Sequence, residues 1–247
     1  MTSFFGANHK RKRGFGKIRL FSTLPSTNDL LKEKGESLPT GSVFIAKGQS
    51  KGKGRMGKSF ISPKGKGLYM SYLFKPNSPE GLGHLTPKTA LVVMDSIKAV
   101  CGIESQIKWV NDILFEGKKL CGILTEVKKG YAVIGIGLNV LGKSEDFPPE
   151  IAKILTTLEE ISGNKFSIKK LALEIIARLD NLDSYSTPYS RYKKHCVTVG
   201  KKVEIISGNQ KYNALVLSLN EDFSLTVKKE GGGYQKVNSG EVSIKEY

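Results

Sequence analysis

The chain has 247 residues, of which 39% are hydrophobic and 25% charged, and its formal net charge is +16 at pH 7. This composition is typical of a globular protein, and no apolar run approaches the roughly 18 residues of a membrane-spanning helix. The basic N-terminus has no apolar stretch after it, which does not fit a secretory signal, so we expect a cytoplasmic protein. The positive charge predicts an anionic partner: nucleic acid, a phosphorylated ligand or an acidic protein.

The cysteines and histidines do not suggest a redox or metal centre. Cys101, Cys121 and Cys196 are widely spaced and form no C-x-x-C pair, so we interpret them as packing residues. The three histidines are isolated in the sequence. We therefore expect neither a histidine-based metal site nor a Ser-His-Asp triad, because each needs several such residues brought together.

The first part of the chain predicts alternating strands and helices. Residues 41–49 and 67–76 are rich in β-branched and aromatic residues, which favours strands. Residues 86–102 predict a helix, with Pro87 in its first turn and Gly102 at its end.

Further along, residues 105–140 contain apolar runs that are broken by two short turns, and they predict three or four antiparallel strands. Amphipathic helices are predicted over 148–163 and 167–186, the second with Ser167 as its N-cap. From about residue 197, short alternating strands separated by turns at Gly208, Asn220 and Gly231–Gly233 predict a small β-barrel.

These elements predict an α+β fold in two domains. Residues 1–195 are expected to form a large domain with a mixed or antiparallel sheet and flanking helices. Residues 196–247 form the small C-terminal β-barrel.

The glycine-rich segment between the first two predicted strands has an unusual charge pattern. From Ala46 to Gly67 it contains no acidic residue. Its basic residues are Lys47, Lys51, Lys53, Arg55, Lys58, Lys64 and Lys66. Repelling cations on a flexible backbone pack poorly, but they can close around a phosphate group, and they order when the ligand binds.

Residues 52–59 of this segment read GKGRMGKS, which matches the P-loop pattern G-x-x-x-x-G-K-[ST]. A P-loop leads directly into a helix whose N-terminus faces the phosphate. Here FISPKGKG follows, and Pro63 and Gly65 disfavour such a helix. We therefore interpret the segment as a basic loop between strands, which binds phosphate or, alternatively, nucleic acid.

A second group of polar residues lies in KWVNDILFEGKKLCGILTE, residues 108–126. Lys108, Asn111 and Asp112 stand at one strand end, and Lys119 follows a tight turn. A hairpin of this kind aims Lys119 back towards Asp112. A purely structural interpretation also fits the segment by itself, with Trp109 in the core and the lysines in solvent.

Five segments occur in a fixed order: STN (26–28), GQSKGKGRMGKSF (48–60), KWVNDI (108–113), KLCGIL (119–124) and GIGLNV (135–140). This pattern closely resembles the biotin–protein ligases, also called biotin–[acetyl-CoA-carboxylase] ligases. The resemblance covers nearly the whole chain and implies that the C-terminal barrel is SH3-like. The chain begins almost directly at the catalytic domain, so the resemblance is to short forms without an N-terminal helix-turn-helix domain.

The resemblance implies an adenylate-forming ligase with two reactions. Biotin and ATP give biotinyl-5′-AMP, and the biotin is then transferred to a specific lysine of a biotin carboxyl carrier protein. ATP, Mg²⁺ and biotin would be bound. We also expect the carrier domain to be acidic, and a homodimer could form through a strand edge in either domain.

The resemblance also implies roles for individual residues. The implied biotin contacts are Ser26, Thr27, Asn28, Gln49, Lys53, Gly54, Arg55, Lys119 and Gly122. The implied ATP and adenylate contacts are Lys53, Arg55, Lys58, Phe60, Lys108, Asn111 and Asn139. The implied catalytic residues are Lys119, Arg55 and Asp112, and Gly135 and Gly137 would let the backbone approach the ligand.

Four residues depart from the family pattern. Lys53 and Lys58 stand where arginine is common, which removes a bidentate donor for phosphate. Phe60 replaces a tryptophan and offers adenine a smaller aromatic face, and Val110 replaces a proline.

Two other functions stay open at this point. A lipoate–protein ligase shares the general fold and the adenylation chemistry. A basic nucleic-acid-binding module would use the lysine loop, the barrel and the HKRKR cluster at residues 9–13, but it gives no reason for KWVND or GIGLN.

Overall fold

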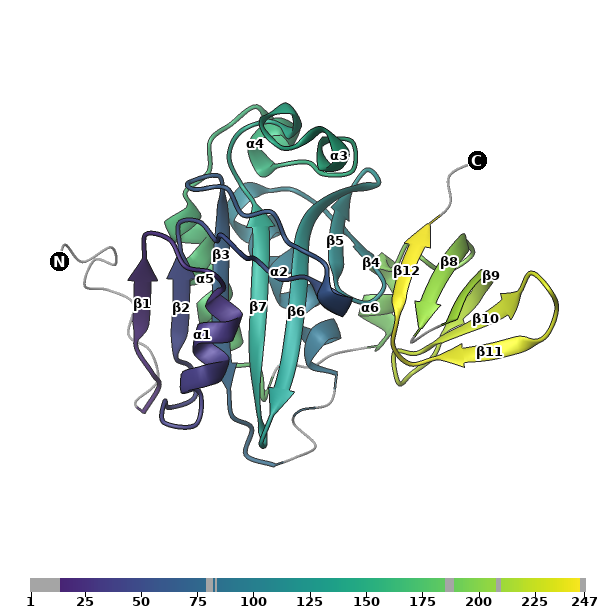
Figure 1. The fold of residues 1–247 in the computed structure, drawn as a ribbon, viewed down its shortest axis with the longest axis horizontal. Helices are drawn as coiled ribbons and strands as arrows, with labels where there is room; N and C mark the ends of the chain where they lie inside the picture. Colours follow the sequence, from purple (N-terminus) through teal and green to yellow (C-terminus); the bar gives the residue numbers. More distant parts are fainter. Residues whose placement is uncertain (1–13, 79–81, 83, 185–188, 208–209, 245–247) are drawn as a thin grey trace.

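The computed structural model describes residues 14–78, 82, 84–184, 189–207 and 210–244 (Figure 1). The basic cluster at residues 9–13 and the turn expected at Gly208 lie outside these ranges. Up to residue 139 the elements are β1 Ile18–Phe21, α1 Thr27–Lys34, β2 Val43–Ala46, η1 Arg55–Gly57, β3 Gly67–Phe74, α2 Leu85–Cys101, β4 Gln106–Lys108, β5 Asp112–Phe115, β6 Lys118–Lys128 and β7 Tyr131–Asn139. After it come η3 Ser144–Asp146, α3 Pro149–Ala152, α4 Leu158–Ser162, α5 Ile168–Leu179, α6 Tyr189–His195, β8 Lys202–Ser207, β9 Gln210–Leu219, β10 Leu225–Lys229, β11 Tyr234–Val237 and β12 Glu241–Ile244.

The large sheet has seven strands in the order β1-β2-β3-β7-β6-β5-β4. β1 and β2 are parallel and the other neighbours are antiparallel, so the sheet is mixed, as predicted. α2 and α5 pack on one face, and α1 covers the other (Figure 1). Because β2, β3 and β7 are buried on both faces, their sequences read as continuous apolar runs rather than alternating ones.

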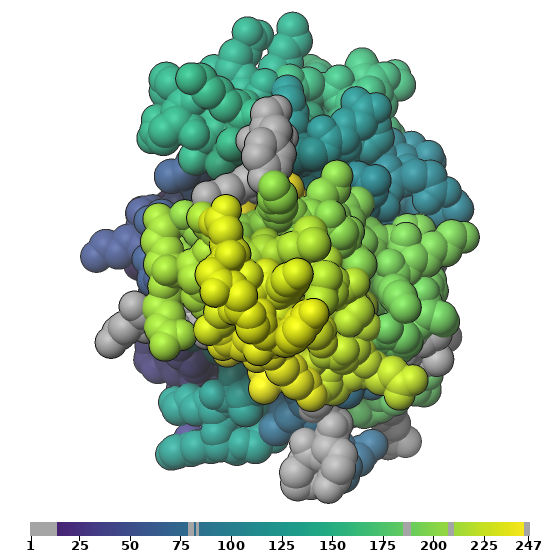
Figure 2. Space-filling model, turned by 90° about the vertical axis from the view of Figure 1, so that its right-hand side faces the viewer, coloured from purple at the N-terminus to yellow at the C-terminus, as the bar shows by residue number. Residues whose placement is uncertain are grey.

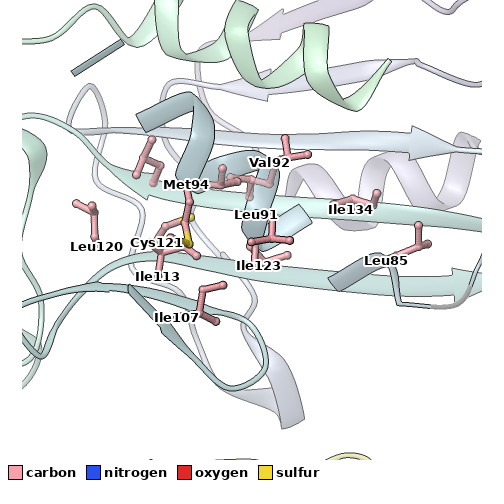
Figure 3. Packing of buried hydrophobic residues seen from close by; sticks show 14 of the residues in the cluster. Leu85, Leu91, Val92, Met94, Ile107, Ile113, Leu120, Cys121, Ile123 and Ile134 are labelled. Carbon is pink, nitrogen blue, oxygen red and sulfur yellow. The ribbon is translucent and has the colours of Figure 1, made fainter. Parts of the chain in front are cut away.

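The main core lies between this sheet and α2. Figure 3 shows Ile113, Cys121 and Ile123 from neighbouring strands packed beneath Leu91 and Met94 of α2. The Cys121 side chain is fully buried, and burial raises the pKa of its thiol, so this cysteine is a packing residue as predicted. A smaller cluster seals α1 against the opposite face of the sheet. The sheet therefore has two covered faces, and it holds its polar strand ends in fixed places.

Most elements predicted in the first part of the chain are confirmed. β2 and β3 lie within the predicted ranges, and four strands follow α2. α2 ends as expected at Gly102, which has φ 70° and satisfies the last turn with its N–H. Ser167 caps α5, and its hydroxyl accepts a hydrogen bond from the N–H of Lys170.

The prediction of one continuous helix over 148–163 is wrong. Two short helices, α3 and α4, form instead, because the backbone between them pairs with the start of β6. Lys119 N–H donates to Ile154 O (2.7 Å), and Thr156 N–H donates to Lys119 O (3.0 Å). Thr157 then caps α4 with its hydroxyl. The second predicted helix is also shorter than expected, since α5 ends at Leu179.

The C-terminal sheet has five antiparallel strands in the order β11-β10-β9-β8-β12. Its two edge strands, β11 and β12, are separated by only residues 238–240 in the sequence. A flat sheet would hold them about 19 Å apart at the usual strand spacing. The short connection reaches at most about 14 Å, so the sheet curls strongly.

The described strands do not close this sheet into a barrel, because no ladder joins β11 to β12. The small C-terminal β domain predicted from the sequence is thus present as a strongly curled antiparallel sheet. Viewed from its own side, this sheet covers the centre of one face of the molecule in yellow and light green (Figure 2). None of the helices in the described ranges is both long and apolar enough to cross a membrane.

Candidate active site

One pocket collects nearly all of the predicted site residues. It is lined by Ser26, Thr27, Asn28, Gln49, Lys53, Gly54, Arg55, Lys58, Ser59, Phe60, Met70, Lys108, Trp109, Asn111, Asp112, Lys119, Gly122, Ile123, Leu124, Gly135, Ile136, Gly137, Glu241 and Val242. These residues come from the start of α1, the glycine-rich loop, strands β3 to β7 and strand β12. Segments that are more than 200 residues apart in the sequence thus share one cavity.

The glycine-rich loop is not a P-loop. Residues Arg55–Gly57 form a single 3-10 turn, after which the chain returns as an extended segment to β3. Phe60 N–H donates to Gly52 O (2.8 Å), and Gly54 N–H donates to Lys58 O (2.7 Å), so the loop folds back on itself as a small hairpin. Its side chains are presented to the pocket without a helix N-terminus.

At one end of the pocket, polar groups surround the start of α1. Ser26 caps the helix, with its hydroxyl accepting from the N–H of Asp29. Gln49 Oε1 accepts hydrogen bonds from the backbone N–H of Thr27 (2.8 Å) and from the Thr27 hydroxyl (3.0 Å). The Ser71 hydroxyl of β3 donates to Asn28 Oδ1 (2.6 Å) and lies within hydrogen-bond distance of Thr27 Oγ1 (2.7 Å). The predicted residues of this end are thus locked together by hydrogen bonds.

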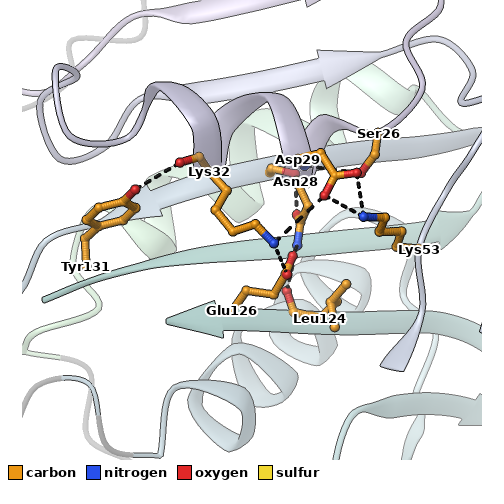
Figure 4. A network of polar contacts seen from close by, with 9 residues as sticks. Ser26, Asn28, Asp29, Lys32, Lys53, Leu124, Glu126 and Tyr131 are labelled. Carbon is orange, nitrogen blue, oxygen red and sulfur yellow. Dashed lines mark hydrogen bonds and ion pairs between the residues drawn. The ribbon is translucent and has the colours of Figure 1, made fainter. Parts of the chain in front are cut away.

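A charged network borders the same end (Figure 4). Lys53 of the loop pairs with Asp29 of α1 at 2.7 Å, and this hydrogen bond raises the pKa of Lys53. Lys32 pairs with Glu126 of β6, whose other oxygen accepts from Asn28 Nδ2 at 2.9 Å. The network ties the loop, α1 and β6 to one another.

At the other end, a polar chain joins the loop to the hairpin of β5 and β6. Arg55 Nη1 donates to Asn111 Oδ1 (3.2 Å), and Asn111 Nδ2 donates to Asp112 Oδ1 (3.1 Å). Lys119 Nζ pairs with the same oxygen of Asp112 at 2.8 Å. The hairpin does aim Lys119 towards Asp112, as the sequence predicted.

Burial shapes the charges in this end of the pocket. Burial lowers the pKa of Lys108 and the pKa of Arg55, and the nearby carboxylate of Asp112 opposes both shifts. Cations that are partly removed from water attract an anionic ligand more strongly than exposed ones, because solvent screens them less.

Phe60 packs directly on the glycines of the pocket floor. A β-carbon added at Gly137 would lie 2.4 Å from the Phe60 ring, and one added at Gly122 would lie 3.0 Å from it. The amino group of Lys119 lies 5.7 Å from the centre of the same ring. The floor at Gly122 and Gly137 therefore has no room for a side chain beneath the Phe60 ring.

Asn139 is the one predicted contact that does not line the pocket. Its side chain is buried, and Nδ2 donates to the carbonyl oxygens of Lys119 (3.4 Å) and Thr156 (3.2 Å). It thus holds the backbone beneath Lys119 rather than facing the cavity. Its position at the end of β7, where the strand meets the segment between α3 and α4, accounts for this difference.

Glu241 and Val242 line the pocket but were missed by the sequence analysis. They belong to β12 of the C-terminal sheet, and Glu241 forms an ion pair with Lys58 of the loop. The sequence offered no signal for them, because the contact joins segments separated by 183 positions. The C-terminal sheet therefore contributes a wall of the site.

Comparisons with known proteins agree with this site. The profile of the biotin/lipoate A/B protein ligase family matches residues 20–140. The chain is 31% identical over 218 residues to the bifunctional ligase/repressor BirA of Bacillus spizizenii, which covers 83% of this chain and 67% of that protein. It is 26% identical over 238 residues to the biotin–[acetyl-CoA-carboxylase] ligase of Mycobacterium tuberculosis, which covers 93% of this chain and 89% of that protein.

Among solved structures, the biotin protein ligase of Aquifex aeolicus in complex with biotin and ATP has a TM-score of 0.79 at 27% identity. The superposition covers 94% of this chain and 100% of that one. The chain therefore belongs to the biotin/lipoate A/B protein ligase family. The relatives named above from Mycobacterium tuberculosis and Aquifex aeolicus are both biotin ligases.

Proposed function

We infer that the protein is an ATP-dependent biotin–protein ligase. It joins biotin and ATP into biotinyl-5′-AMP and then transfers biotin to a lysine of a biotin carboxyl carrier protein. The observation that carries this inference is one pocket that has the polar start of α1 at one end and the cations Arg55 and Lys119 at the other. The similarity to biotin ligases over nearly the whole chain supports it.

The first reaction brings two anions together. A carboxylate oxygen of biotin attacks the α-phosphorus of ATP, and the bond to pyrophosphate breaks. We propose that Lys119 and Arg55 stabilise the charge that builds on the phosphoryl oxygens, with Lys53, Lys58 and Lys108 binding the phosphates. Donors already fixed by the fold need no reorganisation when the charge develops, and this favours the transition state.

In the second reaction, the amine of the carrier lysine attacks the carbonyl carbon of the mixed anhydride. An amide bond forms and AMP leaves, so no protein nucleophile is needed. We propose that Asp112 acts mainly by orienting Lys119, because its carboxylate is already paired with that amine.

The biotin end of the pocket is proposed from the same geometry. Ser26, Thr27, Asn28 and Gln49 line it. Thr27, Asn28 and Gln49 are fixed by hydrogen bonds to one another or to Ser71, and the Ser26 hydroxyl accepts from the N–H of Asp29. We propose that the ureido ring of biotin binds there, with Gly54 and Gly122 giving room for its chain. Phe60 and Asn111 are proposed to contact the nucleotide, and Asn139 to support Lys119 from below.

The residues present do not form a dedicated Mg²⁺ site. The pocket contains two carboxylates, and both are paired with lysines: Asp112 with Lys119, and Glu241 with Lys58. No cluster of three or more potential metal ligands occurs in the described ranges. We propose that Mg²⁺ arrives bound to the phosphates of ATP, as is usual for an ion that keeps several waters.

The experiment that tests the function is biotin-dependent exchange of pyrophosphate into ATP. Exchange with biotin, and its absence with lipoate, is the expected result. Exchange with lipoate alone would identify a lipoate ligase. Binding of random oligonucleotides without any exchange would identify a nucleic-acid-binding module instead.

Replacing Gly135 by alanine is expected to weaken biotin binding about 5- to 100-fold, since overpacking typically costs about 1–3 kcal/mol. The added methyl group would lie 2.3 Å from Asn28 Oδ1, and that side chain is already held by Ser71 and Glu126. Calorimetry with biotin measures the effect. Gly231→Ala is the matched control, because a β-carbon there meets no atom within 4 Å; equal affinities for both variants would contradict the proposed biotin end.

An acidic carrier domain is proposed from the net charge of +16. Opposite charges accelerate encounter, and salt screens them over a Debye length of about 8 Å at physiological ionic strength. We expect the rate of transfer to the carrier to fall as salt is added, while pyrophosphate exchange with small substrates changes much less. If the transfer rate does not respond to salt, the proposed electrostatic steering of the carrier is wrong.

The remaining organisation is proposed as follows. The boundary between the catalytic domain 1–195 and the C-terminal domain 196–247 follows α6, which ends at His195. The outer edge of β1, at the border of the large sheet, is proposed to pair with a second copy in a homodimer, and sedimentation equilibrium tests this. A cytoplasmic location is proposed because the carrier's carboxylase is expected there.

A further inference from the structure

The segment Lys108–Asp112 carries three polar residues of the pocket, and its first half is anchored from outside the pocket, whereas Asn111 is held by Ile123 of β6. Its neighbour Ile107 accepts a hydrogen bond from Val197 N–H at 2.9 Å. Figure 1 shows the strand that leads into it, β4, at the border of the large sheet beside α6 and the C-terminal sheet. A strand at a sheet border has a ladder on one side only, so its position depends on what is packed against its other side.

Trp109 is the centre of this anchoring. Its backbone N–H donates to the hydroxyl of Thr198 at 2.9 Å, and its indole N–H donates to the carbonyl of Phe223 at 2.6 Å. Trp109 is 2% exposed and Thr198 is 0% exposed. Both bonds are therefore shielded from water, and each is costly to lose.

The carbonyl of Phe223 is held in place by its own surroundings. Residues 220–224 form a tight turn, in which Phe223 N–H donates to Asn220 O (2.9 Å) and Asn220 N–H donates to Ser224 O (2.8 Å). The Phe223 ring lies 5.2 Å from the ring of Tyr192 and 4.9 Å from that of His84. The acceptor for the indole is thus fixed by both hydrogen bonds and ring packing.

Tyr192 of α6 holds the same segment from another side. Its side chain is fully buried, and its hydroxyl donates to Val110 O at 3.2 Å. The hydroxyls of Thr198 and Tyr192, which lie outside the pocket, therefore form hydrogen bonds with two consecutive residues of the segment, Trp109 and Val110. The positions of the Lys108, Asn111 and Asp112 side chains depend on where this backbone is held.

We propose that Thr198 and Tyr192 are positioning residues for adenylate formation, which act by fixing Trp109 and Val110 so that Lys108, Asn111 and Asp112 face the nucleotide. This rests on the proposed function. Neither hydroxyl touches the pocket, since neither residue lines it. The C-terminal sheet then serves catalysis through a buried hydrogen bond, in addition to the wall formed by β12.

The chain provides a direct probe, because Trp109 is its single tryptophan. Its fluorescence reports the anchoring without any substrate. Thr198→Val removes the hydroxyl that accepts from the Trp109 backbone N–H and keeps the side-chain shape. We expect the Trp109 emission to shift to longer wavelength as the indole becomes less firmly held. Thr198→Ser keeps the hydroxyl and should retain the emission of the parent.

The kinetic readout separates positioning from simple loss of folding. Thr198→Val is expected to lower kcat for adenylate formation about tenfold, in line with the cost of an unpaired buried N–H. The KM for ATP should rise and the Kd for biotin alone should stay unchanged, because the biotin end lies on α1. Thr198→Ser should restore kcat.

Two matched controls complete the test. Thr89→Val makes the same chemical change at a fully buried threonine on α2 whose hydroxyl has no partner among the described residues, and it should behave as the parent. Cys196→Ala removes a second neighbour of the Thr198 hydroxyl and should leave kcat within about twofold. If Thr198→Val does not fold, Tyr192→Phe takes its place, with the same expected losses.

The proposal is overturned if Thr198→Val keeps the emission and kcat of the parent, or if Thr89→Val or Cys196→Ala reproduces its losses. It is also overturned if the Thr198→Val sample only contains a smaller fraction of active molecules, while the KM for ATP and the Trp109 emission stay those of the parent. That result would indicate a folding defect. Absence of exchange in the parent would refute the proposed function. The emission of the variants, measured without substrate, would still decide whether the segment is anchored in this way.

Discussion

Replacing Lys119 by alanine is expected to slow biotinyl-AMP formation about 10²- to 10³-fold, the usual effect of removing one preorganised donor to a developing charge. Lys119 Nζ lies in the pocket, 2.8 Å from Asp112. Its backbone is fixed on both sides, by Ile154 and Thr156. The fold therefore holds this amine at the pocket, and the loss should appear in kcat of pyrophosphate exchange.

Lys118→Ala is the matched control for this prediction. Lys118 is the preceding residue of β6, it is exposed, and it does not line the pocket. Its removal lowers the net charge by the same amount and should leave exchange unchanged. If both variants form biotinyl-AMP at the rate of the parent, the role proposed for Lys119 is wrong.

Replacing Arg55 by glycine is expected to release the intermediate. The Arg55 guanidinium connects the loop to Asn111 through a 3.2 Å hydrogen bond, in a site where burial lowers its pKa. Hydrogen bonds to charged groups contribute about 1.5–3 kcal/mol, so biotinyl-AMP should dissociate about 10- to 100-fold faster. The free mixed anhydride then reacts with any exposed amine, and bystander proteins in the assay become biotinylated.

The measurement is labelling of an unrelated lysine-rich protein, detected with streptavidin, in the presence of biotin and ATP. Lys51→Ala is the control, since Lys51 is an exposed cation of the same loop that does not line the pocket. Tight retention of the intermediate by Arg55→Gly would refute the idea that this residue closes the loop over it.

Most of the residues named from the sequence line one pocket, and they lie in short, ordered motifs. The hairpin that carries Asp112 and Lys119 is local, so its geometry follows from a tight turn. Pro63 and the nearby glycines were enough to exclude a P-loop. The identity of the pocket-lining residues was therefore available from local features and from the resemblance.

Contacts between distant segments were not predictable in this way. Glu241 reaches the pocket only because the C-terminal sheet curls against the catalytic domain. The break between α3 and α4 arises from pairing with Lys119, a tertiary contact that overrides the amphipathic pattern of 148–163. By contrast, α1 could have been predicted, since Ser26 followed by Asp29 is a recognisable helix start.

The ion pairs around the pocket have a chemical consequence for the protein itself. The reactive intermediate is surrounded by amines of the same kind as the acceptor on the carrier. Lys53 is paired with Asp29, and this hydrogen bond raises the pKa of Lys53, which favours the protonated, non-nucleophilic form of its amine. Asp29 therefore disfavours acylation of Lys53 while the mixed anhydride waits for its proper acceptor.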